Sequence, residues 1–268
     1  MSLAGVAGQG LSTWFDTPPG RYLLQWERAR FDAAVADLFG YHAVQLGLPE
    51  LETLRANRMP NRWLALPEPA DAHEHPALDG RPGCDLVTHA AALPFAAASV
   101  DLLTLPHTLE FSADARTVLR EVERVLVPQG RVVISGLNPN SLWGWRQQRA
   151  NLAQRLGLAA GESGQFLPEA GDLVGSWRLR DWLRLLGLEV ESQTWGCYRP
   201  AVRSDKWLQR YAWMDRAGSR AWPIFGAVYF LVAVKRVRGM HLLGPAWKPR
   251  RAATAPVPVA QKNDISSP

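Results

Sequence analysis

The chain has 268 residues, of which 47% are hydrophobic and 21% charged, so wholesale disorder is excluded and one large domain with extensions is expected. Its two cysteines, Cys84 and Cys197, exclude a disulfide framework and a four-cysteine zinc site. The net charge of +5 is unevenly placed, because residues 1–140 carry 11 basic and 16 acidic side chains and residues 141–268 carry 19 and 9. Nine of the 12 tryptophans also lie after residue 140.

A basic half with interleaved aromatic residues is compatible with nucleic acid, anionic lipid or a phosphorylated substrate as partner, and equally with an ordinary solvated surface. The start of the chain lacks the basic and apolar regions of a signal peptide. The uncharged run at residues 221–234 is shorter than the roughly 20 residues of a spanning helix. We therefore expect a cytoplasmic protein with reduced thiols and no transmembrane segment, and peripheral membrane contact remains open.

The first half of the chain alternates helical and strand patterns. Apolar residues recur at helical spacing up to Phe39, and short apolar runs bounded by glycine or proline follow. In chain order, these patterns predict a helix over 18–39, strands over 42–48, 62–66, 85–88 and 99–105, a helix over 113–127, a turn at 128–130 and a strand over 131–137. This alternation predicts an α/β fold with a mostly parallel sheet.

The second half begins with an amphipathic, aromatic-rich segment over 141–158 and a loop over 161–175. Further along the chain we expect a helix over 178–186, a strand over 188–195, a helix over 205–220 and a strand over 226–234. Proline, alanine, lysine and serine dominate after residue 243, which predicts a disordered tail over 243–268 behind a single domain spanning 1–242.

One stretch carries a family pattern. Residues 89–136 read HAAALPFAAASVDLLTLPHTLEFSADARTVLREVERVLVPQGRVVISG. The positions that fit are Leu93-Pro94-Phe95, Asp101, Leu109-Glu110, Glu121, Arg124-Val125-Leu126 and Pro128. This stretch resembles the type 11 family of class I S-adenosylmethionine-dependent methyltransferases, and the likeness extends more loosely from about residue 30 to 236. The resemblance implies a Rossmann-like class I methyltransferase fold with helices on both faces of the sheet, and S-adenosyl-L-methionine as cofactor.

The resemblance also implies a cofactor site, and this chain departs from the family pattern there. The glycine-rich first motif is reduced to Gln45-Leu46-Gly47-Leu48-Pro49, with Gln45 at the usual acidic position. Glu68 stands where an acid would hold the ribose, and His89 replaces an aspartate near the adenine. The implied cofactor-binding residues are Gln45, Gly47, Glu68, His89, Ala90, Pro106 and His107, with His107 the one candidate for a catalytic base.

Each of these residues also has a structural interpretation. Gln45 and Gly47 can simply end a core strand, Glu68 can be a solvated loop acid, and His107 can be a capped loop histidine. His73-Glu74-His75 lacks the helical spacing of metal ligands and is interpreted as a surface loop, so no metal site is expected.

The tryptophan-rich segments at 142–155 and 206–222 occupy positions where the family carries insertions that cover the acceptor. Trp143, Trp145, Trp207 and Trp213, with Arg146, Arg149 and Arg210, would line a lid over a bulky apolar or anionic acceptor. The alternative is that the same side chains pack these helices onto the core. The leading hypothesis is a methyltransferase for a small-molecule or lipid-like acceptor; the alternatives are an inactive methyltransferase-fold binding protein and, last, a nucleic-acid binder.

Overall fold

The computed structural model describes residues 13–67, 84–156, 166–167 and 173–236. The first long helix is α2 (Pro18–Val35), which the sequence pattern predicts at this place. The side chain of Thr17 accepts a hydrogen bond from the Gly20 amide, and Pro18 occupies the first helical position, where it gives up no hydrogen bond. Leu23, Phe31 and Val35 form its buried face, as the periodicity implies.

Seven strands form one sheet in the order β3-β2-β1-β4-β5-β7-β6. Neighbouring strands are parallel from β3 to β5, and β7 is antiparallel to both β5 and β6. The strands are β1 (His42–Leu46), β2 (Asn61–Leu66), β3 (Leu86–Val87), β4 (Val100–Pro106), β5 (Leu126–Leu137), β6 (Leu188–Gly196) and β7 (Val228–Lys235). The predicted α/β fold with a mostly parallel sheet is confirmed.

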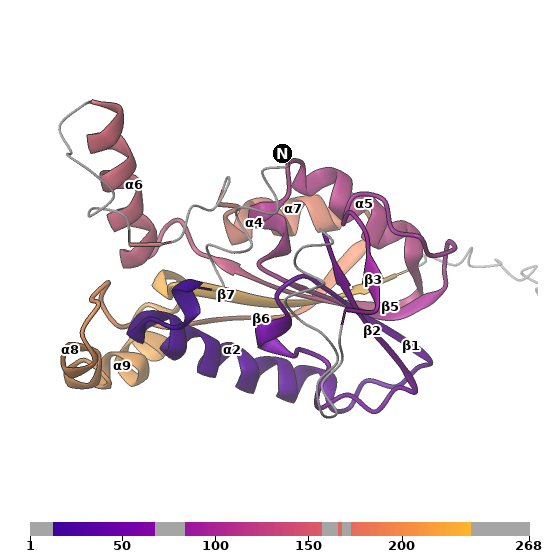
Figure 1. The fold of residues 1–268 in the computed structure, drawn as a ribbon, viewed down its shortest axis with the longest axis horizontal. Coiled ribbons are helices and arrows are strands. Elements are labelled where there is room, and N and C mark those ends of the chain that lie inside the picture. The colour runs from indigo at the N-terminus through magenta and orange to yellow at the C-terminus, as the bar shows by residue number, and fades with distance from the viewer. Residues whose placement is uncertain (1–12, 68–83, 157–165, 168–172, 237–268) are drawn as a thin grey trace, which may run out of the picture. The chain divides into compact units, whose positions relative to one another are not determined.

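Alternating side chains of the central strands supply two cores, one on each face of the sheet, and Figure 1 shows the helices on both sides of the sheet. Helices α5 (Ala115–Val125) and α7 (Ser176–Leu185) cover one face together with the short α4 (Thr108–Phe111). Helix α2 covers the other face, where Phe31 packs edge-on against Phe230 with ring centroids 4.9 Å apart. The central strands are therefore buried on both sides, which explains their near-continuous apolar sequences.

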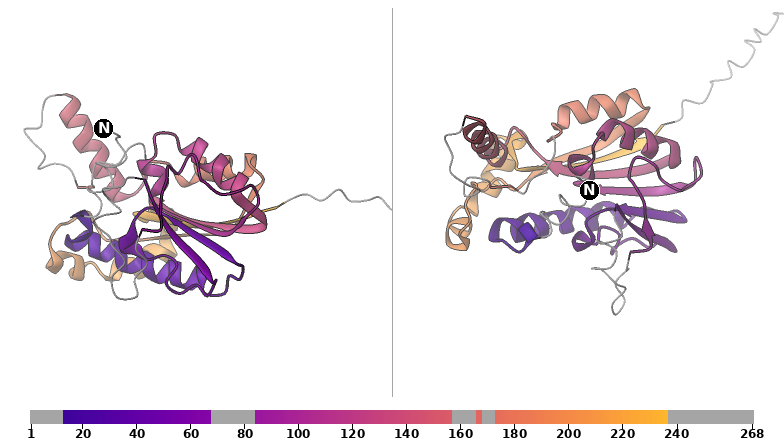
Figure 2. Two further views of the ribbon diagram at one scale, coloured as in Figure 1. Left: turned by 45° about the vertical axis from the view of Figure 1, so that its right-hand side comes forward. Right: turned by 45° about the horizontal axis from the view of Figure 1, so that its top comes forward.

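Three helices and a short 3-10 turn follow the carboxyl ends of β5 and β6. Helix α6 (Leu142–Arg155) comes after β5, while α8 (Asp205–Arg210), α9 (Trp213–Ala221) and η3 (Pro223–Phe225) lie between β6 and β7. Because β5 and β6 both pair antiparallel with β7, they run in the same direction and end at the same edge of the sheet. Figures 1 and 2 show α6 and the α8–α9 pair at this common end.

The connection between β1 and β2 contains very little regular secondary structure. Residues 47–60 are all described, and their one helical element is the single turn η1 (Pro49–Leu51). Leu48 and Glu52 bracket this turn with positive φ angles of 43° and 45°. The first crossover of this parallel sheet therefore relies on a compact loop whose Leu51 and Leu54 are buried under α2.

Two predicted elements are wrong in detail. The expected turn at 128–130 lies inside β5, where a register shift against β4 and a φ of 67° at Gln129 absorb the extra residues. The expected helix over 205–220 is divided into two helices, because α8 ends before Tyr211 and α9 begins at Trp213. Asp215 of α9 accepts hydrogen bonds from Tyr22 and Arg199, which fix the position of the second helix.

Some expectations fall outside the described residues, namely those on Glu68, on His73-Glu74-His75 and on the tail at 243–268. The chain separates into a compact unit over 1–237 and a second unit over 238–268, and the domain boundary at residue 242 stays a prediction. Within the described part of the chain, no helix has the length and apolar character needed to cross a membrane.

Candidate functional site

The candidate site lies at the edge where the parallel strands β1, β4 and β5 end, since ligands of open α/β sheets bind beyond the carboxyl ends of the strands. Gly47 directly follows β1 with a φ of 76°, a conformation that side chains other than glycine rarely adopt. A Cβ built on Gly47 would have Thr108 Oγ1 as its nearest neighbour, 4.0 Å away. Gly47 therefore leaves open space at the edge of the sheet, into which a ligand can approach the backbone.

Gln45 lies two residues before Gly47, and its side chain holds the loop between β1 and β2. Its side chain is buried, and Nε2 donates to the carbonyl oxygens of Gly47 and Leu48 at 3.0 and 2.8 Å. Its Oε1 accepts hydrogen bonds from the amide and the hydroxyl of Thr53, both at 2.8 Å. Both hydrogen-bond donors of Nε2 and both acceptor positions of Oε1 are therefore used within the β1–β2 loop. Gln45 acts on a ligand only by shaping that loop.

His107 follows β4 and sits at the centre of a buried ionic cluster. It is 0% exposed and has a φ of 51°, which is rare for a residue with a side chain. Its Nε2 lies 3.0 Å from Glu27 Oε1, and its Nδ1 lies 3.1 Å from Glu110 Oε2. Glu110 also accepts a hydrogen bond from the Leu137 amide. The cluster thus joins α2, the end of β4, α4 and the end of β5.

The electrostatics of this cluster decide what His107 can do. Burial alone would lower the pKa of His107, but the carboxylates of Glu27 and Glu110 outweigh burial and raise that pKa to about 10. Burial, followed by the charge of Glu110, also raises the pKa of Tyr229 well above its ordinary value. His107 is therefore protonated at neutral pH, and a protonated, enclosed imidazole is not a general base. The geometry favours the interpretation of His107 as a structural histidine.

Sequence reasoning missed Glu27 and Glu110 as members of this cluster. The signal for Glu27 is present in the sequence, because it falls midway between Leu23 and Phe31 at i+4 spacing on the buried face of α2. A carboxylate in an apolar helical stripe needs a buried partner. Its partner, His107, lies 80 positions away, and only the fold brings the two together.

The remaining predicted cofactor residues divide between the interior and the rim. Pro106 is the last residue of β4 and is buried opposite Ser135 of β5. His89 is exposed and Ala90 is half-buried, both in the turn after β3. The structure therefore places Gly47, His89 and Ala90 where a bound molecule can reach them, whereas Gln45, Pro106 and His107 lie behind them.

The tryptophans of the expected lid also divide. Trp143 is fully buried against Trp14, Tyr22 and Phe166, and its Nε1 donates to the Arg199 carbonyl at 2.8 Å. The expectation that Trp143 walls an acceptor site is wrong, because its ring is part of the core on the α2 side of the sheet. Trp145, Trp207 and Trp213 are instead exposed.

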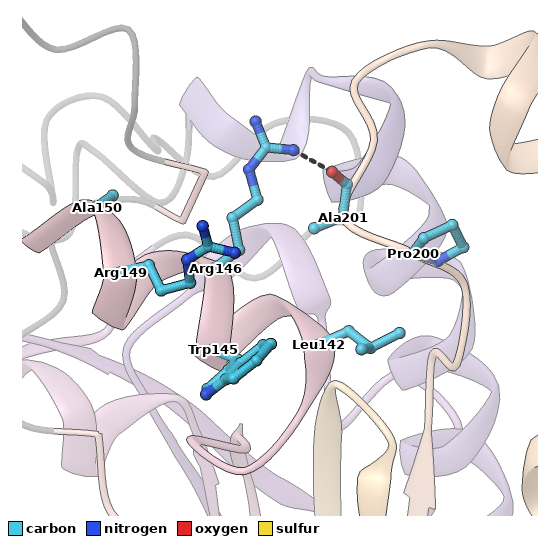
Figure 3. Close-up of a pocket in the computed structure, with 7 residues that line it drawn as sticks. All are labelled: Leu142, Trp145, Arg146, Arg149, Ala150, Pro200 and Ala201. Atoms are coloured by element: carbon cyan, nitrogen blue, oxygen red, sulfur yellow. Dashed lines mark hydrogen bonds between the residues drawn. The ribbon is translucent and has the colours of Figure 1, made fainter.

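An open pocket of about 570 Å³ lies beside Trp145 at the base of α6 (Figure 3). Its lining residues are Leu142, Trp145, Arg146, Arg149, Ala150, Pro200 and Ala201. Arg146 crosses from α6 to donate a hydrogen bond to the Ala201 carbonyl, and the guanidinium of Arg149 lies over the Trp145 ring, 5.9 Å from its centroid. The pocket thus combines an apolar wall with two cationic side chains.

Comparison with known proteins agrees with this geometry. Residues 70–134 match the family model described as a methyltransferase domain. The matched stretch overlaps the motif region that resembles the type 11 family of class I methyltransferases. The strand order, with its antiparallel β7, and the motif region therefore confirm the family resemblance of the sequence.

Several solved structures share the fold of this chain. An S-adenosylmethionine-dependent methyltransferase from Thermotoga maritima, described as a possible histamine N-methyltransferase, is 14% identical, with a TM-score of 0.60 over 87% of this chain and 100% of that one. A chain from the complex of the Haloferax volcanii Trm112 methyltransferase activator with a methyltransferase is 18% identical, with a TM-score of 0.55 over 88% and 100%. At these identities the likeness concerns the fold.

A relative by sequence is the uncharacterized protein YafS of Escherichia coli K12. It is 39% identical to this chain over 98 residues, which are 37% of this chain and 36% of that protein. This chain thus matches just over a third of the length of that relative.

The residues at the sheet edge fit S-adenosylmethionine in part. Gly47 offers the open, left-handed backbone position that close approach of a cofactor requires, and His89 and Ala90 are accessible after β3. In place of the family's glycine-rich turn, the chain has the loop over residues 47–60 with the single turn η1. The fit therefore rests on Gly47 and the rim, without the interior side chains that the resemblance implied.

Proposed function

We propose that the chain is an S-adenosylmethionine-dependent methyltransferase that acts on a small-molecule or lipid-like acceptor. The observation that carries the proposal is the open left-handed position of Gly47 at the end of β1, in a sheet of methyltransferase strand order. When bound, the cofactor supplies an electrophilic methyl group on a sulfonium sulfur.

The residues around Gly47 have distinct roles in this proposal. Gln45 and Thr53 hold the loop that approaches the cofactor, and Ala90 lies at the rim where the adenine end would rest. Glu27 and Glu110 flank the imidazole of His107 on both sides. His107 holds its proton between the carboxylates and positions α2 against β4 without taking part in proton transfer.

The acceptor side of the proposal rests on the end of the molecule that carries α6, α8 and α9. Trp145 and Leu142 give the pocket at the base of α6 an apolar wall, and Arg146 and Arg149 give it positive charge. Such a lining suits an amphipathic, anionic acceptor better than a neutral polar one. The lid over the acceptor, formed by Trp145, Trp207 and Trp213 with Arg149 and Arg210, stays a prediction. The cytoplasmic location also stays a prediction.

A second candidate function is a methyltransferase fold that binds a metabolite or protein without catalysis. The burial of Gln45 and His107 favours this binding function, because the polar atoms of both side chains already contact other residues of the chain. The two functions differ in whether a methyl group leaves the cofactor.

Methyl transfer separates them. We expect the wild-type protein, incubated with methyl-tritiated S-adenosylmethionine and a total cell extract, to transfer label at a rate at least tenfold above that of Gly47→Ala. Gly187→Ala is the matched control, because Gly187 has nearly the same φ, 74°, with equally open space at the opposite edge of the sheet. Partition of the label into organic or aqueous solvent then identifies a lipid-like or a polar acceptor. Equal labelling by wild type and Gly47→Ala would contradict the enzymatic function.

A further inference from the structure

Helix α6 exposes an apolar stripe. Leu142, Trp145, Leu152 and Leu156 are 49%, 63%, 57% and 62% exposed. With Arg149 they follow one another at intervals of three or four residues, so their side chains share one face of the helix. An isolated exposed leucine is ordinary, whereas a continuous stripe along a projecting helix marks a surface that is covered by something else.

A second exposed aromatic group lies at the same end of the molecule. Trp207, Trp213, Trp222 and Phe225, on and around α8, α9 and η3, are all substantially exposed. Since α6 follows β5 and the α8–η3 segment follows β6, both groups lie at the edge where these strands end (Figures 1 and 2). The two groups together gather exposed apolar side chains at the end of the sheet where β5 and β6 finish.

The charge around these groups is positive. The sequence of α6, LWGWRQQRANLAQR, contains three arginines and no acidic residue. In the segment over 205–225, the two acids are already paired, Asp205 with Arg21 at 3.5 Å and Asp215 with Arg199 at 2.9 Å. Among the described residues, neither Arg146 nor Arg149 has an acidic partner.

We propose that this end of the molecule, the α6 stripe with the exposed aromatic residues of α8, α9 and η3, docks on an anionic lipid bilayer. Leucine and tryptophan side chains enter the interface between headgroups and acyl chains, and arginines at the same level bind lipid phosphates. A lipid surface satisfies both features at once. A nucleic acid would leave the leucines in water, and a second copy of α6 would bring arginine against arginine with no acid to balance them.

The proposal goes beyond the proposed function and does not depend on it, because docking requires neither cofactor nor methyl transfer. It does add a consequence for the candidate site. The pocket between Leu142 and Ala201 would open at the docked end, so that a lipid headgroup could enter it from the bilayer.

Sedimentation with extruded vesicles tests the docking, using the full chain without cofactor. We expect the protein to bind phosphatidylcholine vesicles containing 30% phosphatidylglycerol (roughly the anionic content that makes a surface potential effective) and to bind pure phosphatidylcholine at least tenfold more weakly. Leu152→Ser combined with Leu156→Ser should lower the partition coefficient for the anionic vesicles at least tenfold. Raising the salt should also weaken binding, because lipid phosphates and arginines are then screened.

Leu185→Ser is the matched control variant. Leu185 is a helical leucine that is 78% exposed at the end of α7, just before β6 begins and thus at the opposite edge of the sheet. It should bind vesicles like the wild type, and circular dichroism should show all variants folded. Wild-type protein that ignores anionic vesicles at low salt, or a double variant that binds them unchanged, would overturn the proposal. So would a dimer in sedimentation velocity that the same double substitution dissociates, since the stripe would then cover a second copy.

Discussion

Replacing His107 with alanine should lower the free energy of unfolding by about 3–5 kcal/mol, because it leaves Glu27 and Glu110 buried without their counter-charge. Urea denaturation at pH 7 measures the loss. His89→Ala is the control, since His89 is exposed and its removal should change the free energy of unfolding by less than about 0.5 kcal/mol. An ordinary point mutation lowers the free energy of unfolding by about 1 kcal/mol. A loss for His107→Ala no larger than this would show that the cluster does not hold charged carboxylates.

The same cluster predicts a pH dependence. The pKa of His107 is raised in the folded protein from the ordinary 6.5 to about 10. The stability that the charged histidine contributes is therefore fully present below pH 6.5 and is lost as the pH rises through about 10. By this linkage, the difference in unfolding free energy between wild type and His107→Ala should shrink between pH 7 and pH 10, by on the order of 4 kcal/mol at most. A difference that stays constant over this range would contradict the raised pKa.

Trp143→Ala should be the most damaging substitution among the tryptophans of the second half, with a loss of about 3–5 kcal/mol in unfolding free energy. Trp143 is fully buried, its ring centroid lies 5.3 Å from that of Phe166, and its indole hydrogen bond to the Arg199 carbonyl would be lost as well. Thermal or urea unfolding measures the effect. Trp143→Phe, which keeps an aromatic ring, should restore more than half of the loss.

Trp145→Ala provides the contrast from the same helix. Trp145 is 63% exposed, so its loss should change the unfolding free energy by less than about 0.5 kcal/mol. If Trp145 walls an acceptor site, methyl transfer should fall in this well-folded variant, and the effect on activity is then separate from stability. Comparable destabilisation by Trp143→Ala and Trp145→Ala would contradict the placement of Trp143 in the core.

The motifs that identify the family in the sequence turn out to perform structural tasks. Asp101 accepts hydrogen bonds from the amides of Tyr41 and His42, both at 2.9 Å, and so ties β4 to the start of β1. Arg124 donates to the carbonyls of Leu93 and Phe95, also at 2.9 Å each, and pairs with Glu121. These contacts join β4 to β1 and α5 to the segment before β4. Because they hold the sheet and its helices together, a motif of about 48 residues that contains them predicts the fold.

The candidate site was less predictable, for two physical reasons. The ion pair of Glu27 with His107 joins residues that are 80 positions apart, and no local pattern encodes such a contact. The loop after β1 holds its shape through hydrogen bonds between Gln45 and Thr53, which lie eight residues apart and which no motif in the sequence indicates. Gly47 is implied by the family resemblance, and the structure shows a φ of 76° there, which glycine adopts without strain.

The central claim is that the sheet edge at Gly47 still binds the methyltransferase cofactor. Calorimetric titration with S-adenosylhomocysteine tests it most directly, because this product of methyl transfer binds without turnover. We expect one site per chain with a dissociation constant between about 1 µM and 1 mM, the usual range for enzyme ligands. Gly47→Ala should weaken the binding at least tenfold and Gly187→Ala should leave it unchanged. Absence of any binding heat up to millimolar ligand, or equal binding by both glycine variants, would contradict it.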